Sequence, residues 1–204
     1  MLAQKKIFVQ LPPPTFKSKN SLEEVLLLRR SIRSYKNEPI NLSELSQILW
    51  AAQGITEKNY DLRTAPSAGA LYPLEIYAIV GNVENLDSGV YKYIAKDHLL
   101  EKTLDGDKRL DLQKSALDQE SIGECALAIV IAAVFSRTSW KYGPRAKQYV
   151  YMEVGHCAQN ILLQATSLQL GSVPIGAFYD EVVQKTLNLP KNEQPVYIIP
   201  IGKV

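Results

Sequence analysis

Cysteine and histidine are both scarce in this sequence, with two residues of each among 204. Cys125 and Cys157 stand among apolar neighbours and form no CxxC pair, which argues against a disulfide framework or a thiolate zinc site. His98 and His156 form no HExxH pair, so we predict no metal site. We expect both cysteines to be buried in a reducing compartment, and the protein to be cytoplasmic.

Excess charge and long apolar runs are also missing. Lys and Arg number 23 against 21 Asp and Glu, a net charge of +2, so we expect no nucleic-acid or membrane partner. The longest apolar run, residues 126–135, is about half the roughly 20 residues that a membrane-spanning helix needs. The motifs GxxxxGK[ST], GxGxxG and GxSxG are absent, which argues against the commonest nucleotide-phosphate loops and against a serine hydrolase.

The residues that are present favour one domain of mixed helices and strands. Pro12, Pro13 and Pro14 mark residues 1–20 as an extended proline-rich arm, lying on the surface or on a partner subunit, and residues 21–204 form a single domain. Hydrophobic periodicity predicts helices at 21–28, 43–53, 105–117, 144–170 and 180–187, and strands at 75–81, 89–95, 98–103, 126–135, 172–175 and 195–204. This order is typical of an α+β fold. Residues 55–73 have no period and form a long loop, a common place for function.

Four segments carry residues suited to ligand binding, and each also has a plain structural explanation. Residues 29–33 (RRSIR) could grip a phosphate, or form a solvated basic helix end. Residues 65–73 (APSAGALYP) could let backbone amides approach a flat ligand, or form a simple connection. Residues 173–178 could meet a ring edge, or form a tight turn. Lys141-Tyr142 could supply a cation and a proton donor, or begin a solvated helix.

Taken in order, and together with residues 153–160 (EVGHCAQN), these segments resemble the flavin-dependent nitroreductase family. The closest likeness is to its SagB/ThcOx-type dehydrogenase branch, and it runs from about residue 20 to the C-terminus. The resemblance implies a nitroreductase-like α+β fold, with a mostly antiparallel central sheet, surrounding helices and a long central helix. It also implies a homodimer with FMN at the interface, bound by both subunits.

The resemblance further implies which residues form the site. Lys141 and Tyr142 match the Lys–Tyr pair with which peptide azoline dehydrogenases of this branch abstract a proton. The FMN-binding residues would fall into three segments and a C-terminal tail, with the second segment approaching from the other subunit and the third lying along the isoalloxazine near N5. They are Arg29, Arg30, Ser31 and Arg33; Pro66, Ser67, Ala68 and Gly69; Pro174, Ile175, Gly176 and Ala177; and Lys203.

The expected function is therefore an FMN-dependent oxidoreductase that transfers hydride through flavin N5 with ping-pong turnover. Its substrate would be a small organic or heterocyclic molecule, and NAD(P)H is a candidate electron donor. The alternative is a non-catalytic module of the same fold that holds flavin or binds peptide. Two departures from the family bear on this choice: only about twenty residues precede the first helix, and Ala70 and Leu71 stand near the place of the usual nitroreductase Asn.

Overall fold

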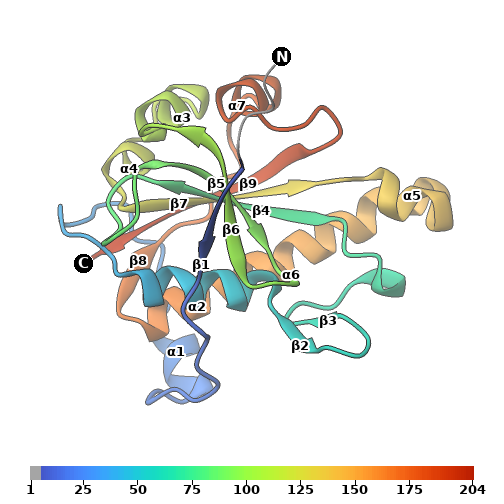
Figure 1. Ribbon diagram of the computed structural model, residues 1–204, viewed down its shortest axis with the longest axis horizontal. Coiled ribbons are helices and arrows are strands. Elements are labelled where there is room, and N and C mark those ends of the chain that lie inside the picture. Colours follow the sequence, from blue (N-terminus) through green and yellow to red (C-terminus); the bar gives the residue numbers. More distant parts are fainter. Residues whose placement is uncertain (1–5) are drawn as a thin grey trace.

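A seven-stranded antiparallel sheet forms the centre of the computed structural model, which describes residues 6–204 (Figure 1). The strand order is β1-β6-β5-β4-β7-β9-β8. The strands are β1 (Ile7–Gln10), β4 (Leu74–Val80), β5 (Gly89–Ile94), β6 (Leu99–Asp105), β7 (Leu127–Ala133), β8 (Leu170–Ser172) and β9 (Gln194–Lys203). The predicted α+β class and the mostly antiparallel sheet are confirmed.

Helices cover both faces of the sheet, and this explains the continuous apolar run of β7. One face packs against α2 (Leu42–Gln53) and α6 (Ala146–Ser167), while the other lies against α3 (Arg109–Ser115), α4 (Glu120–Glu124) and α7 (Asp180–Thr186) (Figure 1). Successive side chains of a strand point to opposite faces, so β7 contributes to both cores. Leu127, Ile129 and Ile131 belong to the first, and Ala128, Val130 and Ala132 to the second.

The predicted long helix is α6, which spans 22 residues. Its predicted apolar stripe is buried at Val150, Val154, Cys157, Ile161 and Ala165. The opposite stripe, which includes Tyr151 and Met152, is exposed to solvent. None of the helices in residues 6–204 combines the length and apolarity that a membrane span requires.

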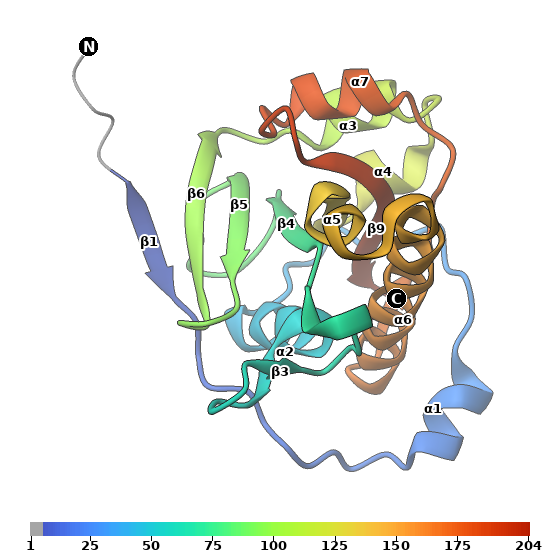
Figure 2. The same cartoon turned by 90° about the vertical axis from the view of Figure 1, so that its right-hand side faces the viewer.

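The chain from residue 11 to 20, here called the strap, crosses the surface from β1 to the short helix α1 (Leu22–Leu28) (Figure 2). The predicted N-terminal arm therefore includes a strand of the sheet as well as an extended segment. Within the strap, Thr15 donates its backbone N–H to Gln47 Oε1 at 2.8 Å, and the Phe16 ring lies 5.4 Å from that of Trp50. Asn20 donates to the carbonyl oxygen of Ser167 at 3.1 Å. The strap thus fastens α1 to the C-terminal end of α6.

Several short elements differ from the sequence prediction. The predicted loop contains a small hairpin, β2 (Ile55–Glu57) and β3 (Leu62–Arg63), and a helical turn, η1 (Ala68–Ala70). Residues 136–145 form α5 (Ser136–Tyr142) and the turn η2 (Gly143–Arg145), whereas the predicted helix began only at residue 144. The strand predicted at 172–175 is instead β8 at Leu170–Ser172, two residues earlier. It stops before Pro174, which has no N–H to continue the ladder.

Candidate active site

The basic segment 29–33 follows α1 and runs beside β8. The backbone N–H of Ile32 donates to the carbonyl oxygen of Ser172 at 3.0 Å, which fixes the position of the neighbouring Ser31. Arg30 turns back on its own helix, where its Nη1 donates at 2.8 Å to the carbonyl oxygens of Leu27 and Arg29. Among residues 6–204, no acidic side chain forms a salt bridge with Arg29 or Arg33. These two guanidiniums are therefore the ones available to an anion.

Lys203, the predicted basic residue of the C-terminal tail, lies at the end of β9. Its Nζ is 2.6 Å from Oε1 of Glu44, and the other oxygen of this carboxylate accepts from the backbone N–H of Asn41 in the capping box of α2. Glu44 thus already balances the charge of Lys203. Phosphate binding by Lys203 stays a prediction, and the phosphate would have to compete with Glu44.

The small-residue segment 66–72 forms a tight loop with three left-handed residues. They are Gly69 (φ 62°), Ala70 (φ 54°) and Tyr72 (φ 45°). Left-handed backbone is unfavourable for residues other than glycine, so the surroundings must hold Ala70 and Tyr72 in place. The Ser67 hydroxyl oxygen does part of this by accepting from the backbone N–H of Tyr72 at 2.8 Å.

Glu153 holds the same loop from α6. Its Oε1 accepts from the backbone N–H of Ala68 at 2.9 Å, and the residue is only 5% exposed. Burial raises the pKa of the Glu153 carboxyl, while the hydrogen bonds from Ala68 and Ser67 oppose the shift. The role of Glu153 was not predicted. The signal in the sequence was an acidic residue next to Val154, inside the buried stripe of α6.

The predicted catalytic pair meets this loop at Gly69. A methyl group added at Gly69 would lie 2.8 Å from Lys141 Nζ and 2.8 Å from the Tyr142 hydroxyl oxygen. The ammonium and the phenol therefore converge on one backbone position, about seventy residues away in the sequence. Because α5 ends at Tyr142, both side chains project from its last turn. The ring of Tyr142 is also held edge-on by Tyr149, with centroids 5.1 Å apart.

The third predicted segment, residues 174–177, leaves β8 and passes along β9. Ile175 and Ile198 exchange both of their backbone hydrogen bonds, at 2.8 and 3.0 Å. After this anchor Gly176 and Ala177 are exposed. The carbonyl oxygen of Ala177 accepts from Gln119 Nε2 at 2.9 Å, so a side chain of the segment before α4 limits the movement of the turn.

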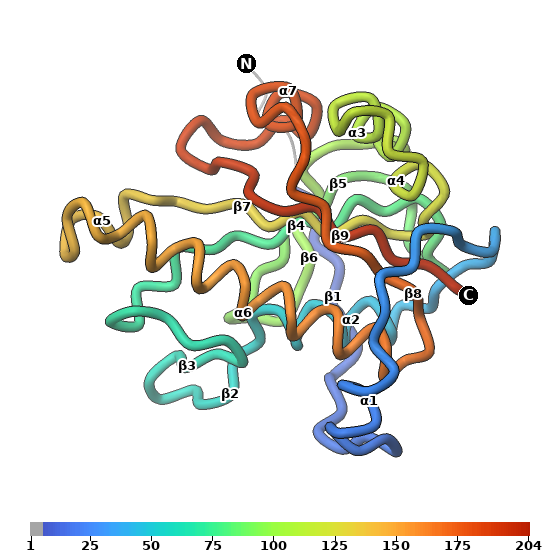
Figure 3. Tube along the Cα trace, turned by 180° about the vertical axis from the view of Figure 1, so that it is seen from behind, coloured from blue at the N-terminus to red at the C-terminus, as the bar shows by residue number. Residues whose placement is uncertain are grey.

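One chain does not bring all these segments together. The 66–72 loop and Lys141-Tyr142 lie at the N-terminal end of α6, near Glu153, whereas residues 29–33 lie with α1 and β8 at its C-terminal end, near Ser167 (Figures 1 and 3). Glu153 and Ser167 are 14 residues apart on α6, a rise of about 21 Å. The predicted site residues of one chain thus fall into two groups, here called half-sites, that lie about 21 Å apart along α6.

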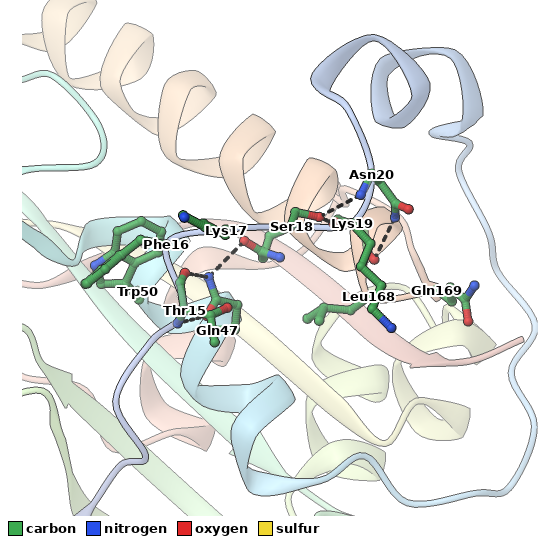
Figure 4. Close-up of a pocket in the computed structure, with 12 residues that line it drawn as sticks. Thr15, Phe16, Lys17, Ser18, Lys19, Asn20, Gln47, Trp50, Leu168 and Gln169 are labelled. Carbon is green, nitrogen blue, oxygen red and sulfur yellow. Dashed lines mark hydrogen bonds between the residues drawn. The ribbon is translucent and has the colours of Figure 1, made fainter.

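A separate pocket of ≈ 510 Å³ opens under the strap, between α2 and the end of α6 (Figure 4). Gln47, Trp50 and Leu168 are among the residues that line it, with Lys17 and Lys19 from the strap. None of the predicted site residues lines this pocket. This pocket is therefore separate from the candidate active site, which cavity volume alone would not have located.

Comparison with known proteins shows the family to which this chain belongs. The model of the Nitroreductase family matches residues 26–203, and the chain belongs to this family, as predicted. A protein of Methanocaldococcus jannaschii named as a nitroreductase is 46% identical over 182 residues, which cover 89% of this chain and 90% of that protein. Family membership supports a general oxidoreductase role.

Two further relatives agree with the predicted branch and fold. The microcin B17-processing protein of Escherichia coli is 33% identical over 132 residues, covering 62% of this chain and about half (48%) of that protein. A crystal structure named as a nitroreductase, from Ralstonia eutropha, superimposes with a TM-score of 0.86 at 27% identity, covering 97% of this chain and 89% of the other. The nitroreductase-like fold is confirmed.

Proposed function

We propose that this protein is an FMN-dependent oxidoreductase that works as a homodimer. It would transfer hydride through flavin N5 with ping-pong turnover, acting on a small organic or heterocyclic substrate in the cytoplasm, with NAD(P)H as a candidate electron donor. The observation that carries the proposal is the separation of the half-sites along α6. Each half-site has part of what an oxidoreductase site needs: a cationic segment on one side, and a small-residue loop with a proton-carrying pair on the other.

A second copy would complete both half-sites at once. If two α6 helices pack antiparallel about a two-fold axis, the N-terminal end of one meets the C-terminal end of the other. The 66–72 loop of one subunit then faces residues 29–33 of its partner. Apolar surface is exposed on the elements that such a dimer would use, since Tyr151 and Met152 on α6 are 47% and 49% exposed. On α1, four leucines are more than half exposed, Leu22, Leu26, Leu27 and Leu28.

The residues of the two half-sites have the chemistry that FMN binding requires. Arg29 and Arg33 would bind the FMN phosphate and the pyrimidine edge through charge-assisted hydrogen bonds. The Ser67–Gly69 backbone leaves room for a flat ring, because no side chain larger than Ser occupies it. When bound, FMN supplies the hydride acceptor. Lys141 and Tyr142 would then hold or remove the proton at the substrate carbon.

An absorbance spectrum of the purified protein, from about 300 to 550 nm, tests the proposal first. We expect stoichiometric FMN, released by heat, and turnover with NAD(P)H plus a nitroaromatic compound, a quinone or oxygen. A colourless protein that fails to take up added FMN would overturn the proposal. FMN binding without turnover toward any of these partners would favour the non-catalytic module instead.

The dimer makes a separate prediction at Met152. We expect Met152→Glu to weaken the dimer by about 100-fold or more, because burying unpaired carboxylates at a symmetric interface costs several kcal/mol. FMN should be lost along with the dimer, since each site needs two subunits. Light scattering during size-exclusion chromatography, combined with flavin content, measures both.

Leu110→Glu is the matched control for that experiment. Leu110 is 63% exposed on α3, on the other side of the sheet, and the same apolar-to-acidic change there should leave the dimer and FMN intact. A Met152→Glu protein that remains dimeric and yellow would show that α6 does not form the interface.

A further inference from the structure

A pocket of ≈ 240 Å³ lies behind the 66–72 loop, between β3, β4, β5 and α5. Arg63, Arg137 and Lys96 contribute cations to its lining, and Glu75 contributes the acid. Gln53 and Tyr93 are among the neutral groups that line it. The pocket thus has three cations and one acid, and the ion pairs around it determine which cation is left without an acidic partner.

The local acids are already balanced by cations other than Arg63. The Glu75 carboxylate pairs with the Arg137 guanidinium and, at 3.1 Å, with Lys92 Nζ. Lys92 also pairs with Glu193 at 2.7 Å. Two acids and two cations therefore form one neutral network that joins β4, β5, α5 and the segment before β9.

Arg63 stands outside this network. Its Nη1 donates to the neutral Gln53 Oε1 at 3.0 Å, and its guanidinium carbon lies 4.5 Å from the centre of the Tyr72 ring. Its Nε–H is buried and meets no acceptor among the residues that the structure describes. Burial lowers the pKa of the Arg63 guanidinium, the nearby Glu75 carboxylate opposes this shift, and the charge of Arg137 acts in the same direction as burial. A partly buried guanidinium without an acidic partner is suited to an anionic ligand.

The pocket lies next to the predicted catalytic pair. Arg137 precedes Lys141 by one turn of α5, so their Cβ atoms are about 5–6 Å apart on the same face of the helix. Arg137 Nη1 donates to the carbonyl oxygen of Tyr72, the last residue of the loop, at 3.0 Å, while Lys141 reaches Gly69 in the middle of the loop. An anion bound at Arg63 would thus lie beside the same loop as the reacting groups.

We propose that Arg63 binds the carboxylate of the substrate, so that this protein prefers small carboxylate-bearing molecules over their uncharged counterparts. The inference rests on the proposed function and specifies its substrate class. A guanidinium presents paired N–H donors that match the two oxygens of a carboxylate. The size of the pocket fits one carboxyl group and part of a ring.

A pair of electron acceptors that differ only in this group tests the inference. For wild-type protein we expect kcat/KM to be higher for 4-nitrobenzoate than for its methyl ester. Arg63→Gln should lower kcat/KM for 4-nitrobenzoate by about 10- to 100-fold, mostly through KM, because a hydrogen bond to a charged group is worth about 1.5–3 kcal/mol. Turnover of the ester should fall much less than that of 4-nitrobenzoate, and Arg63→Lys should restore part of the preference.

Lys58→Gln controls for long-range charge. Lys58 is exposed in the turn between β2 and β3, on the same hairpin as Arg63, and its neutralisation should leave the acceptor preference intact. Equal kcat/KM for the acid and the ester in wild-type protein would overturn the inference. An equal loss of preference in Lys58→Gln would overturn the role of Arg63.

A binding measurement separates this inference from the proposed function. Benzoate should raise the thermal midpoint of the flavin-loaded wild-type protein, benzamide should not, and Arg63→Gln should abolish the shift. If benzoate binds in this way while no reductase activity is found, the anion site stands and the proposed function fails. Turnover of both acceptors without preference and without benzoate binding leaves the proposed function standing and removes the anion site.

Discussion

Replacing Arg29 and Arg33 together by alanine should weaken FMN binding by about 100-fold or more, since each charge-assisted contact contributes about 1.5–3 kcal/mol. The expectation follows from the state of the two guanidiniums, which have no acidic partner within residues 6–204. Titration of FMN into the flavin-free protein, followed by quenching of flavin fluorescence, measures the change in affinity. Circular dichroism establishes that the variant is folded.

Arg30→Ala is the internal control for that prediction. Its guanidinium already caps the carbonyl oxygens of Leu27 and Arg29, so its removal should cost α1 some stability and change FMN affinity less than threefold, roughly 0.6 kcal/mol. If all of these variants bind FMN as wild type does, the segment is only a basic helix end. If Arg30→Ala weakens FMN binding more than the double variant does, the Arg30 side chain must leave these carbonyl oxygens and contact FMN when it binds.

Much of the fold could be predicted from periodicity because burial determines it. The apolar run of β7 packs on both faces of the sheet, and the stripe from Val150 to Ala165 packs along α6. In both cases the spacing of apolar residues along the sequence indicates which side chains are buried in the folded protein. The capping boxes at Ser21 and Asn41 likewise place the starts of α1 and α2 from local chemistry alone. The start of α1 agrees with the prediction, and α2 begins at Leu42, one residue before its predicted start.

The short elements near the site have weaker local signals. Helix α5 is seven residues long and ends in Trp140, Lys141 and Tyr142, of which the first two are exposed, so no apolar stripe identifies it. Three further features, all long-range, were invisible in the sequence. The sequence could not show that Lys141 and Tyr142 lie at Gly69, that Glu153 binds the loop from α6, or that Arg63 lacks an acidic partner.

Lys141→Met should lower turnover by about 10²- to 10⁴-fold while the protein keeps its FMN, because a positioned proton-transfer group contributes a factor of this size. Tyr142→Phe removes only the hydroxyl and should act in the same direction. Steady-state kinetics and flavin content, measured on the same preparation, separate loss of chemistry from loss of cofactor. Lys185→Met, an exposed lysine of α7, is the control and should retain full turnover.

Gly69→Ala tests the same pair without changing either residue. The added methyl group would lie 2.8 Å from both polar atoms, at a backbone φ of +62° that alanine rarely adopts. Both side chains must therefore move, and we expect turnover to fall at least tenfold, equivalent to about 1.4 kcal/mol in the barrier. If Lys141→Met and Gly69→Ala both leave turnover within twofold of wild type, the ammonium and the phenol are surface groups. Loss of turnover in both, with FMN retained, would place the chemistry where the Lys–Tyr pair meets the loop.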